Sequence, residues 1–281
     1  MHSRLKKIKL IVFDLDGTLL SNEGEIGERT KYYVSELKKT GVQFSFASGR
    51  LHSAIVNYAK ELDIQAPVIS LDGCYIKNLA GDKVIFEMFV KPKHVKRAIK
   101  FADHYLLNIA LCHSDAIYIT DQNTVLPQIM DKFGAEYREI ESYDNHLSKT
   151  LEIVFAGSNK EWIKYVYNKM SFPYCAGLAL NYYQSHSHEG IYYLEVRRKG
   201  SSKAKGFARL CKGLKVKQTE SAVLGDWYND ISSFKTKAVK VAVANAVPEL
   251  KRMADIVTKR TNDEDGVAEF LEMVYKAKTG K

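Results

Sequence analysis

The segment Lys9–Leu20 reads KLIVFDLDGTLL and governs how the rest of the chain is interpreted. Its apolar run, Leu10–Phe13, stops abruptly at Asp14, and Asp16 follows two residues later. A short apolar run bounded by a turn signal is typical of a strand buried on both faces of a parallel sheet. The two acids therefore come just past the carboxyl end of that strand, where open α/β sheets bind ligands. Neighbouring carboxylates need a cation, and hard oxygen ligands favour Mg²⁺, so we predict a magnesium site; a solvated Asp-Gly turn is the alternative.

The composition is that of a globular protein with a basic surplus. The 281 residues suffice for one large domain or two ordinary ones, and the apolar and charged fractions are 46% and 27%. Lys and Arg exceed Asp and Glu by 42 to 33, which favours an anionic partner such as nucleic acid, an acidic membrane or a phosphorylated metabolite. The surplus is concentrated in Lys91–Lys100 and Arg197–Lys217, and we interpret both stretches as solvated faces.

The cysteines and the apolar segments bear on the compartment. The four cysteines are far apart and form no C-x-x-C pair, which is typical of reduced thiols in a cytosolic protein. The apolar run near the start is too short for a signal peptide, and no segment approaches the ~18 apolar residues of a membrane span. We therefore expect a cytoplasmic protein.

The first part of the chain predicts alternating strands and helices with short connections. After the opening strand we expect helices at Glu28–Lys39 and Leu51–Leu62 and strands at Val42–Ala47 and Val68–Leu71. A β-α-β-α-β order implies right-handed crossovers and a parallel sheet.

From about Val84 the pattern changes to consecutive strands flanked by helices, which suggests an inserted α+β module. The expected strands are 84–90, 108–113, 116–120, 151–156, 178–184 and 191–197, and the expected helices are 92–106, 123–133 and 160–170. The earlier rhythm then resumes with helices at 203–214, 231–236, 248–253 and 267–277 and strands at 222–224, 238–244 and 255–258. We therefore predict an α/β fold: a Rossmann-like doubly wound parallel-sheet core of residues 1–83 and 189–281, with an inserted α+β domain at 84–188.

Polar residues that follow the expected strands should meet at one sheet edge. They are Asp14, Asp16, Thr18, Ser48, Asp226, Asn229 and Asp230. The carboxylates among them need counter-charge, which Mg²⁺ and Lys203 can supply. A carboxylate beside a metal can attack phosphorus, while a second acid protonates the leaving oxygen and then activates water, and this division of labour fits Asp14 and Asp16. The Ser48 hydroxyl and Lys203 would bind the oxygens of the transferring group.

Four motifs carry a family resemblance. They are Asp14-Leu15-Asp16-Gly17-Thr18, Ser48-Gly49-Arg50, Ser202-Lys203 and Gly225-Asp226-Trp227-Tyr228-Asn229-Asp230. In order and separation they resemble the haloacid dehalogenase superfamily of phosphohydrolases, closest to the Cof-type sugar phosphatases with a type II cap, over nearly the whole chain. On this resemblance the inserted domain is the cap that sets substrate specificity.

The resemblance implies a role for each acid. Asp14 would be the nucleophile and Asp16 the general acid and base. Magnesium would be held by the Asp14 carboxylate, the Asp16 carbonyl and Asp226, with Asp230 supporting the site. The later segment Val243-Ala244-Asn245-Ala246 resembles a closing segment of the family, which we interpret as structural.

The resemblance also assigns the phosphate-binding side chains, and the chain departs from the family at two nearby positions. Ser48 and Lys203 would bind the phosphoryl group, and Asn229 would orient it or the metal-bound waters. Asp72 stands where the family commonly has Asn, which leaves its contact open. Trp227 stands where the family often has a small residue, and we interpret it as a packing residue.

The leading hypothesis is a Mg²⁺-dependent phosphatase that hydrolyses small organophosphates, sugar phosphates first, through an aspartyl phosphate on Asp14. A phosphotransferase, such as a hexose-phosphate mutase, uses the same motifs and is the alternative. A third possibility is a non-enzymatic protein that binds polyanions, although the acidic cluster would repel nucleic acid. We expect a small phosphorylated metabolite as partner, and neither nucleic acid nor membrane; the sequence does not determine the oligomeric state.

Overall fold

β1 (Leu10–Phe13) belongs to a five-stranded parallel sheet with the strand order β14-β13-β12-β1-β2. The other strands are β2 (Gln43–Phe46), β12 (Ser221–Gly225), β13 (Val239–Ala242) and β14 (Ile256–Val257). In register, Leu10 lies opposite Ser221 of β12 on one side and Gln43 of β2 on the other. Every side chain of β1 is buried, as expected of a strand covered on both faces.

The structure is a computed structural model that describes residues 2–79, 81, 83–120, 135–184 and 189–280. The chain divides into two units. The first comprises Met1–Gly49, Ile55–Ile85 and Ser202–Lys281, and the second comprises Arg50–Ala54 and Phe86–Ser201.

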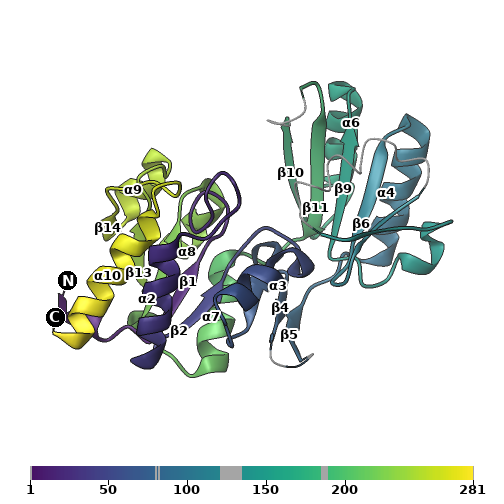
Figure 1. The fold of residues 1–281 in the computed structure, drawn as a ribbon. Coiled ribbons are helices and arrows are strands. Elements are labelled where there is room, and N and C mark those ends of the chain that lie inside the picture. Colours follow the sequence, from purple (N-terminus) through teal and green to yellow (C-terminus); the bar gives the residue numbers. More distant parts are fainter. Residues whose placement is uncertain (1, 80, 82, 121–134, 185–188, 281) are drawn as a thin grey trace. The chain divides into compact units, whose positions relative to one another are not determined.

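Helices pack around the parallel sheet of the first unit. They are α1 (His2–Lys6), α2 (Glu28–Lys39), α3 (His52–Glu61, which begins in the second unit), α7 (Lys203–Leu214), α8 (Ile231–Phe234), α9 (Pro248–Met253) and α10 (Gly266–Thr279), with the 3₁₀ turns η1 (Leu71–Gly73), η3 (Gln218–Glu220) and η4 (Tyr228–Asp230). The closing helix α10 packs beside α2 and contacts α1 (Figure 1). Lys278 Nζ also donates to the backbone oxygen of Lys6 at 3.2 Å, so the first and last helices are tied together.

A smaller sheet extends the first unit beyond β2. It contains β3 (Val68–Ser70), β4 (Tyr75–Lys77) and β5 (Val84–Glu87) in that order. A parallel bridge between Ala47 and Ile69 joins it to the end of β2. The sequence analysis missed β4, because a three-residue strand carries too little alternation to be recognised. It also assigned β5 wholly to the inserted domain, whereas the first two residues of this strand lie in the first unit.

The second unit is built on a six-stranded sheet with the order β10-β11-β9-β6-β7-β8. Its elements are β6 (Asn108–Cys112), β7 (Ile117–Ile119), β8 (Tyr137–Glu139), β9 (Glu152–Gly157), β10 (Leu178–Gln184), β11 (Tyr192–Arg198), α4 (Pro92–Tyr105), α6 (Lys160–Met170) and η2 (Tyr143–His146). Among the described strand pairs of this six-stranded sheet, β7–β8 is parallel and the others are antiparallel. Ile153, Phe155 and Leu194 of the sheet form one core cluster with Val95 of α4 and Ile163 of α6, so both helices cover the same sheet face (Figure 1).

The chain returns to the first unit later than the sequence predicted, because β11 is hydrogen-bonded within the sheet of the second unit. β11 pairs antiparallel with β10, with Gln184 opposite Tyr192, and also with β9. The sequence analysis had placed residues 189–281 in the core domain, because it took the polar stretch before β11 for the linker. In the structure the second unit continues to Ser201, so the break follows β11. The helix expected at 123–133 lies outside the described residues.

The fold class is confirmed: a parallel, helix-flanked α/β core accompanied by an α+β unit. Within the described ranges, the helices are all too short or too polar to cross a lipid bilayer. The cytoplasmic location stays a prediction.

Candidate active site

Three loops begin at the carboxyl ends of the central strands β1, β2 and β12. Asp14 follows β1, and its N–H donates to the Leu224 oxygen of β12 at 3.1 Å. Ser48 follows β2, one residue after Ala47, whose N–H donates to the Phe13 oxygen at 2.8 Å. These hydrogen bonds extend the parallel ladder past the strand ends and fix where each loop begins.

The loop after β1 folds back on itself. The Leu15 oxygen accepts hydrogen bonds from the N–H groups of Thr18, Leu19 and Leu20 at 3.2, 3.0 and 2.9 Å. Gly17 has a φ of +74°, and a Cβ at this position would lie 2.5 Å from Asp226 Oδ2. Only glycine therefore lets the loop approach the acid that follows β12.

Two asparagines from the C-terminal part of the first unit hold this loop. Asn245 Nδ2 donates to the Gly17 oxygen at 2.7 Å, and Asn262 Nδ2 donates to the Leu20 oxygen at 2.9 Å. The backbone N–H of Asn262 donates in turn to Asn245 Oδ1 at 3.0 Å, which links the two residues. The sequence analysis noted the segment around Asn245 as structural but did not connect it to the loop, since residues so far apart in the chain show no local signal.

Three buried carboxylates form the centre of the site. Oxygens of Asp14, Asp226 and Asp230 lie within 4.8 Å of one another, and the residues are 5%, 7% and 2% exposed. Lys203 Nζ, fully buried at the start of α7, donates to Asp14 Oδ1 at 2.6 Å and to Asp230 Oδ1 at 2.7 Å. One ammonium against three carboxylates leaves two negative charges when all are ionised.

The pKa values reflect this imbalance. Burial and the charge of Asp230 raise the pKa of Asp14 well above its ordinary value. Burial likewise raises the pKa of Asp226 to about 6. Burial acts to lower the pKa of Lys203, but Asp14 and Asp230 outweigh it and raise that pKa above its ordinary value. The cluster therefore holds protons more tightly than isolated carboxyls do, and a further cation would relieve it.

Asp230 and Thr18 organise the acids rather than pointing away from them. Asp230 Oδ2 accepts hydrogen bonds from the backbone N–H groups of Asp226 and Trp227 at 3.2 and 3.3 Å. Thr18 Oγ1 donates to Asp226 Oδ1 at 2.8 Å. Since Asp230 already accepts three hydrogen bonds, Asp14 and Asp226 have more oxygen capacity left for a ligand.

The donor set fits a divalent cation. Three converging carboxylates with surplus negative charge are hard oxygen ligands of the kind that bind Mg²⁺. Asp16 is exposed and its carboxylate lies outside this triad; metal binding by its backbone carbonyl stays a prediction.

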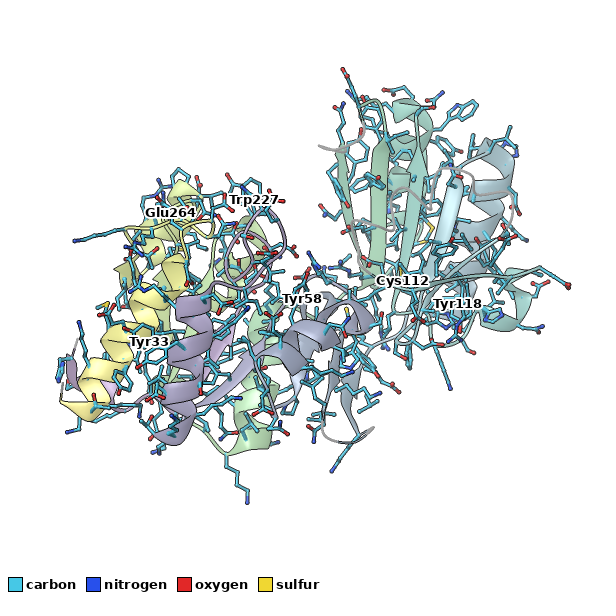
Figure 2. The ribbon with its side chains drawn as sticks, viewed as in Figure 1. Tyr33, Tyr58, Cys112, Tyr118, Trp227 and Glu264 are labelled. Carbon is cyan, nitrogen blue, oxygen red and sulfur yellow. The ribbon has the colours of Figure 1, made fainter. Side chains whose placement is uncertain are left out.

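Two further predicted residues, Ser48 and Asn229, are linked to each other through Asp72. The Asp72 N–H donates to the oxygen of the buried Ser48 at 3.0 Å, and Asn229 Nδ2 donates to Asp72 Oδ1 at 3.4 Å. Asp72, whose contact the sequence left open, thus links the loops that carry Ser48 and Asn229. Trp227 is 54% exposed and contacts Tyr228 with ring centroids 5.2 Å apart (Figure 2). The interpretation of Trp227 as a packing residue was wrong, because the indole lies on the surface of the loop.

Known proteins resemble the chain over nearly its full length. The family model for haloacid dehalogenase-like hydrolases matches residues 11–271. The stress response protein YhaX of Bacillus subtilis (strain 168) is 26% identical over 97% of this chain and 95% of its own length. Phosphatase YwpJ of the same organism is 25% identical over 94% of this chain and 99% of its own length. The crystal structure of a haloacid dehalogenase-like hydrolase from Bacteroides thetaiotaomicron matches with a TM-score of 0.84 and 27% identity, over 95% of this chain and 99% of that one.

The match of the family model spans the strand-end loops that carry Asp14, Ser48, Lys203 and Asp226. It therefore covers all of the loops that build the acidic cluster, and the chain belongs to the haloacid dehalogenase-like hydrolase family.

Proposed function

We propose that this hydrolase is a Mg²⁺-dependent phosphatase that acts on small organophosphates, sugar phosphates first. The observation that carries the proposal is the buried cluster of Asp14, Asp226 and Asp230 around Lys203 at the carboxyl edge of the sheet. It combines a nucleophile, a cation site and a fixed ammonium, which phosphoryl transfer requires. The similarity to Phosphatase YwpJ supports the same chemistry.

Asp14 is the nucleophile in this proposal. One of its carboxylate oxygens attacks phosphorus, and the bond from phosphorus to the substrate's leaving oxygen breaks as the aspartyl phosphate forms. Asp16, which is exposed in the loop after β1, gives its proton to the leaving oxygen. Asp16 then takes a proton from water as the water oxygen attacks phosphorus and the bond from phosphorus to the Asp14 oxygen breaks, which releases inorganic phosphate and restores the Asp14 carboxylate.

The other residues hold charge and position. Mg²⁺ would be held by the Asp14 and Asp226 carboxylates and the Asp16 carbonyl, with Asp230 in support, and when bound it supplies neutralisation of the phosphoryl oxygens. Lys203, already aimed at Asp14 Oδ1, reduces the repulsion between that carboxylate and an incoming anion.

Substrate contacts complete the proposal. Ser48 and Lys203 bind the phosphoryl oxygens, and Asn229, held by Asp72, orients the group or its waters. The second unit, which continues to Ser201, acts as the cap that selects the leaving group, and the predicted residues 84–188 cover most of it. Small phosphorylated metabolites are the partners.

The test is release of inorganic phosphate from a panel of sugar phosphates, nucleotides and simple esters, with Mg²⁺ and with chelator. We expect metal-dependent release, and a loss of at least about 1,000-fold in Asp14→Asn. Circular dichroism of this variant checks that the fold is intact. Unchanged turnover in Asp14→Asn would disprove the nucleophile assignment.

The same panel separates hydrolysis from transfer. Adding an acceptor sugar and measuring bisphosphate distinguishes a phosphotransferase, because the phosphoryl group then moves to a hydroxyl instead of to water. Bisphosphate as the main product would overturn the phosphatase proposal while leaving Asp14 as nucleophile.

A further inference from the structure

The second unit contains two adjoining cavities that the proposed catalysis does not use. The larger has a volume of about 450 Å³ and is lined by Lys93, His94, Lys96, Arg97, Lys100 and Tyr174, together with Cys175. The smaller has a volume of about 200 Å³ and is lined by Lys91, His94, Arg198 and Lys199, together with residues 176–178. His94 lines both, so we call them the paired cavities. They bring together the two basic stretches that the sequence analysis had interpreted as solvated faces.

The charge of the paired cavities is one-sided. Seven of the lining residues are Lys or Arg, and none is Asp or Glu. None of the seven forms a salt bridge with a carboxylate in the part of the chain that the structure describes. In contrast Arg197, the neighbour of Arg198 in β11, donates to Glu152 Oε1 at 2.5 Å. Six of the seven belong to exposed residues, so water screens their repulsion in part, but no described carboxylate pairs with them.

Two polar groups in the walls have unused hydrogen-bonding capacity. His94 is 7% exposed, and no described residue hydrogen-bonds its imidazole. The Nε of Arg97 is buried and has no partner among the described residues. Burial lowers the pKa of His94, and the charges of Lys93, Lys91 and Arg97 lower it further. The buried and unpartnered Nε of Arg97 is costly unless a ligand satisfies it.

The backbone of one wall and the Tyr174 ring are held in place by contacts within the chain. The Lys199 N–H donates to the Gly177 oxygen at 2.8 Å, and Arg198 lies opposite Leu178 in the β10–β11 ladder. Lys169 Nζ lies 4.3 Å from the centroid of the Tyr174 ring, which braces the side chain at the rim of the larger cavity. A preformed concave wall loses little entropy when an anion binds.

We propose that the paired cavities bind a compact polyphosphate anion, either free or attached to a nucleoside, with its phosphate oxygens held by the cations of Lys91–Lys100 and Arg198–Lys199. The larger cavity falls in the size range of small-molecule sites. Lys and Arg are the usual ligands of phosphate oxygens, and seven of them exceed what one phosphate needs. The paired cavities are two adjoining open hollows, which favours a compact anion over an extended nucleic-acid strand, because a strand calls for a continuous groove. The inference does not depend on the proposed phosphatase activity.

The test is calorimetric titration of the full chain with tripolyphosphate, with ATP and with a single-stranded oligonucleotide, in metal-free buffer at low salt. We expect tripolyphosphate to bind with a Kd of about 100 μM or lower. Lys96→Glu combined with Lys100→Glu should weaken this binding at least about tenfold, because both exposed side chains line the larger cavity. Tighter binding of ATP than of tripolyphosphate would identify a nucleoside contact, which Tyr174→Ala should then remove.

A matched control distinguishes binding at the paired cavities from attraction by the net charge of the protein. Lys7→Glu combined with Lys212→Glu changes the charge equally at exposed positions outside both cavities, and it should leave binding within about twofold of the wild type. Equal weakening by both double variants would overturn the proposal, since net charge alone would then explain binding. Binding of the oligonucleotide alone, or no binding of tripolyphosphate at about 1 mM, would overturn it as well.

Discussion

The acidic cluster of the first unit and the paired cavities of the second carry opposite surpluses of charge. In the acidic cluster the one ammonium, Lys203, is fully used by two carboxylates, and the surplus is negative. In the paired cavities no described carboxylate pairs with any of the seven cations, and the surplus is positive. The net charge of +9 therefore says little about either site, because a ligand responds to the local surplus of negative or positive charge.

Removing the lysine from the acidic cluster should have the largest effect. Lys203→Met leaves three buried carboxylates without their cation, which should lower the free energy of unfolding by about 3–5 kcal/mol. Phosphate release should fall at least about 100-fold, because the ammonium that faces Asp14 is lost. Urea unfolding with and without Mg²⁺ measures the first effect, and we expect Mg²⁺ to recover part of it.

Lys212→Met on the same helix is the control, since Lys212 is exposed. It should change stability by less than about 0.5 kcal/mol. Equal losses of stability in the two variants would contradict this prediction, because the ammonium of Lys203 would then not stabilise the buried carboxylates.

Adding a side chain at Gly17, where the loop after β1 approaches Asp226, should have an intermediate effect on stability. In Gly17→Ala the new Cβ would lie 2.5 Å from Asp226 Oδ2, at a φ of +74°. Gly41→Ala has a similar φ of +82° but meets nothing within 4 Å. We expect a loss of about 1 kcal/mol for Gly41→Ala and about 2–3 kcal/mol for Gly17→Ala, measured by thermal unfolding. Equal losses would show that the loop yields, and that the acids are not held by close packing.

The smallest effect concerns His94 in the paired cavities. Lys93→Gln should raise the pKa of His94 towards its ordinary value, because one of the charges that lower it is removed; Lys7→Gln should not. Since the folded pKa lies below the unfolded value of about 6.5, the unfolded state binds the proton first and His94 costs stability as pH falls below that value. Lys93→Gln should therefore lose less stability on acidification. NMR titration of the imidazole checks the shift, and no difference between the two variants would show that the cavity field does not reach His94.

The position of the candidate site residues at one sheet edge could be predicted because one rule places them, while their catalytic roles stay predictions. Asp14, Ser48 and Asp226 each follow a buried strand of the parallel sheet, and parallel strands end at a common edge. Helix limits with clear signals, such as Glu28–Lys39 and Lys203–Leu214, agree with the structure to the residue. The pairing of Lys203 with both Asp14 and Asp230 has no such rule, because it depends on side-chain directions across two loops.

Long-range pairing explains what the sequence did not predict. β11 was assigned to the wrong side of the division because its partners, β10 and β9, are set by register and not by its own composition. The paired cavities escaped prediction for a similar reason: Lys91–Lys100 and Arg198–Lys199 each look like a solvated stretch, and only the folded second unit places Lys91 and His94 beside Arg198 and Lys199. Asn245 reaches Gly17 across most of the chain in the same way.

The central position of β1 has a consequence for how the chain is made. Its neighbour β12 is translated some 200 residues later, so one edge of the apolar strand Leu10–Phe13 stays unpaired while Phe86–Ser201, the main segment of the second unit, is already complete. An open apolar edge is a template for association with other chains. The nascent protein is therefore most exposed to aggregation just before Ser221–Gly225 leaves the ribosome, and synthesis that pauses there prolongs this interval.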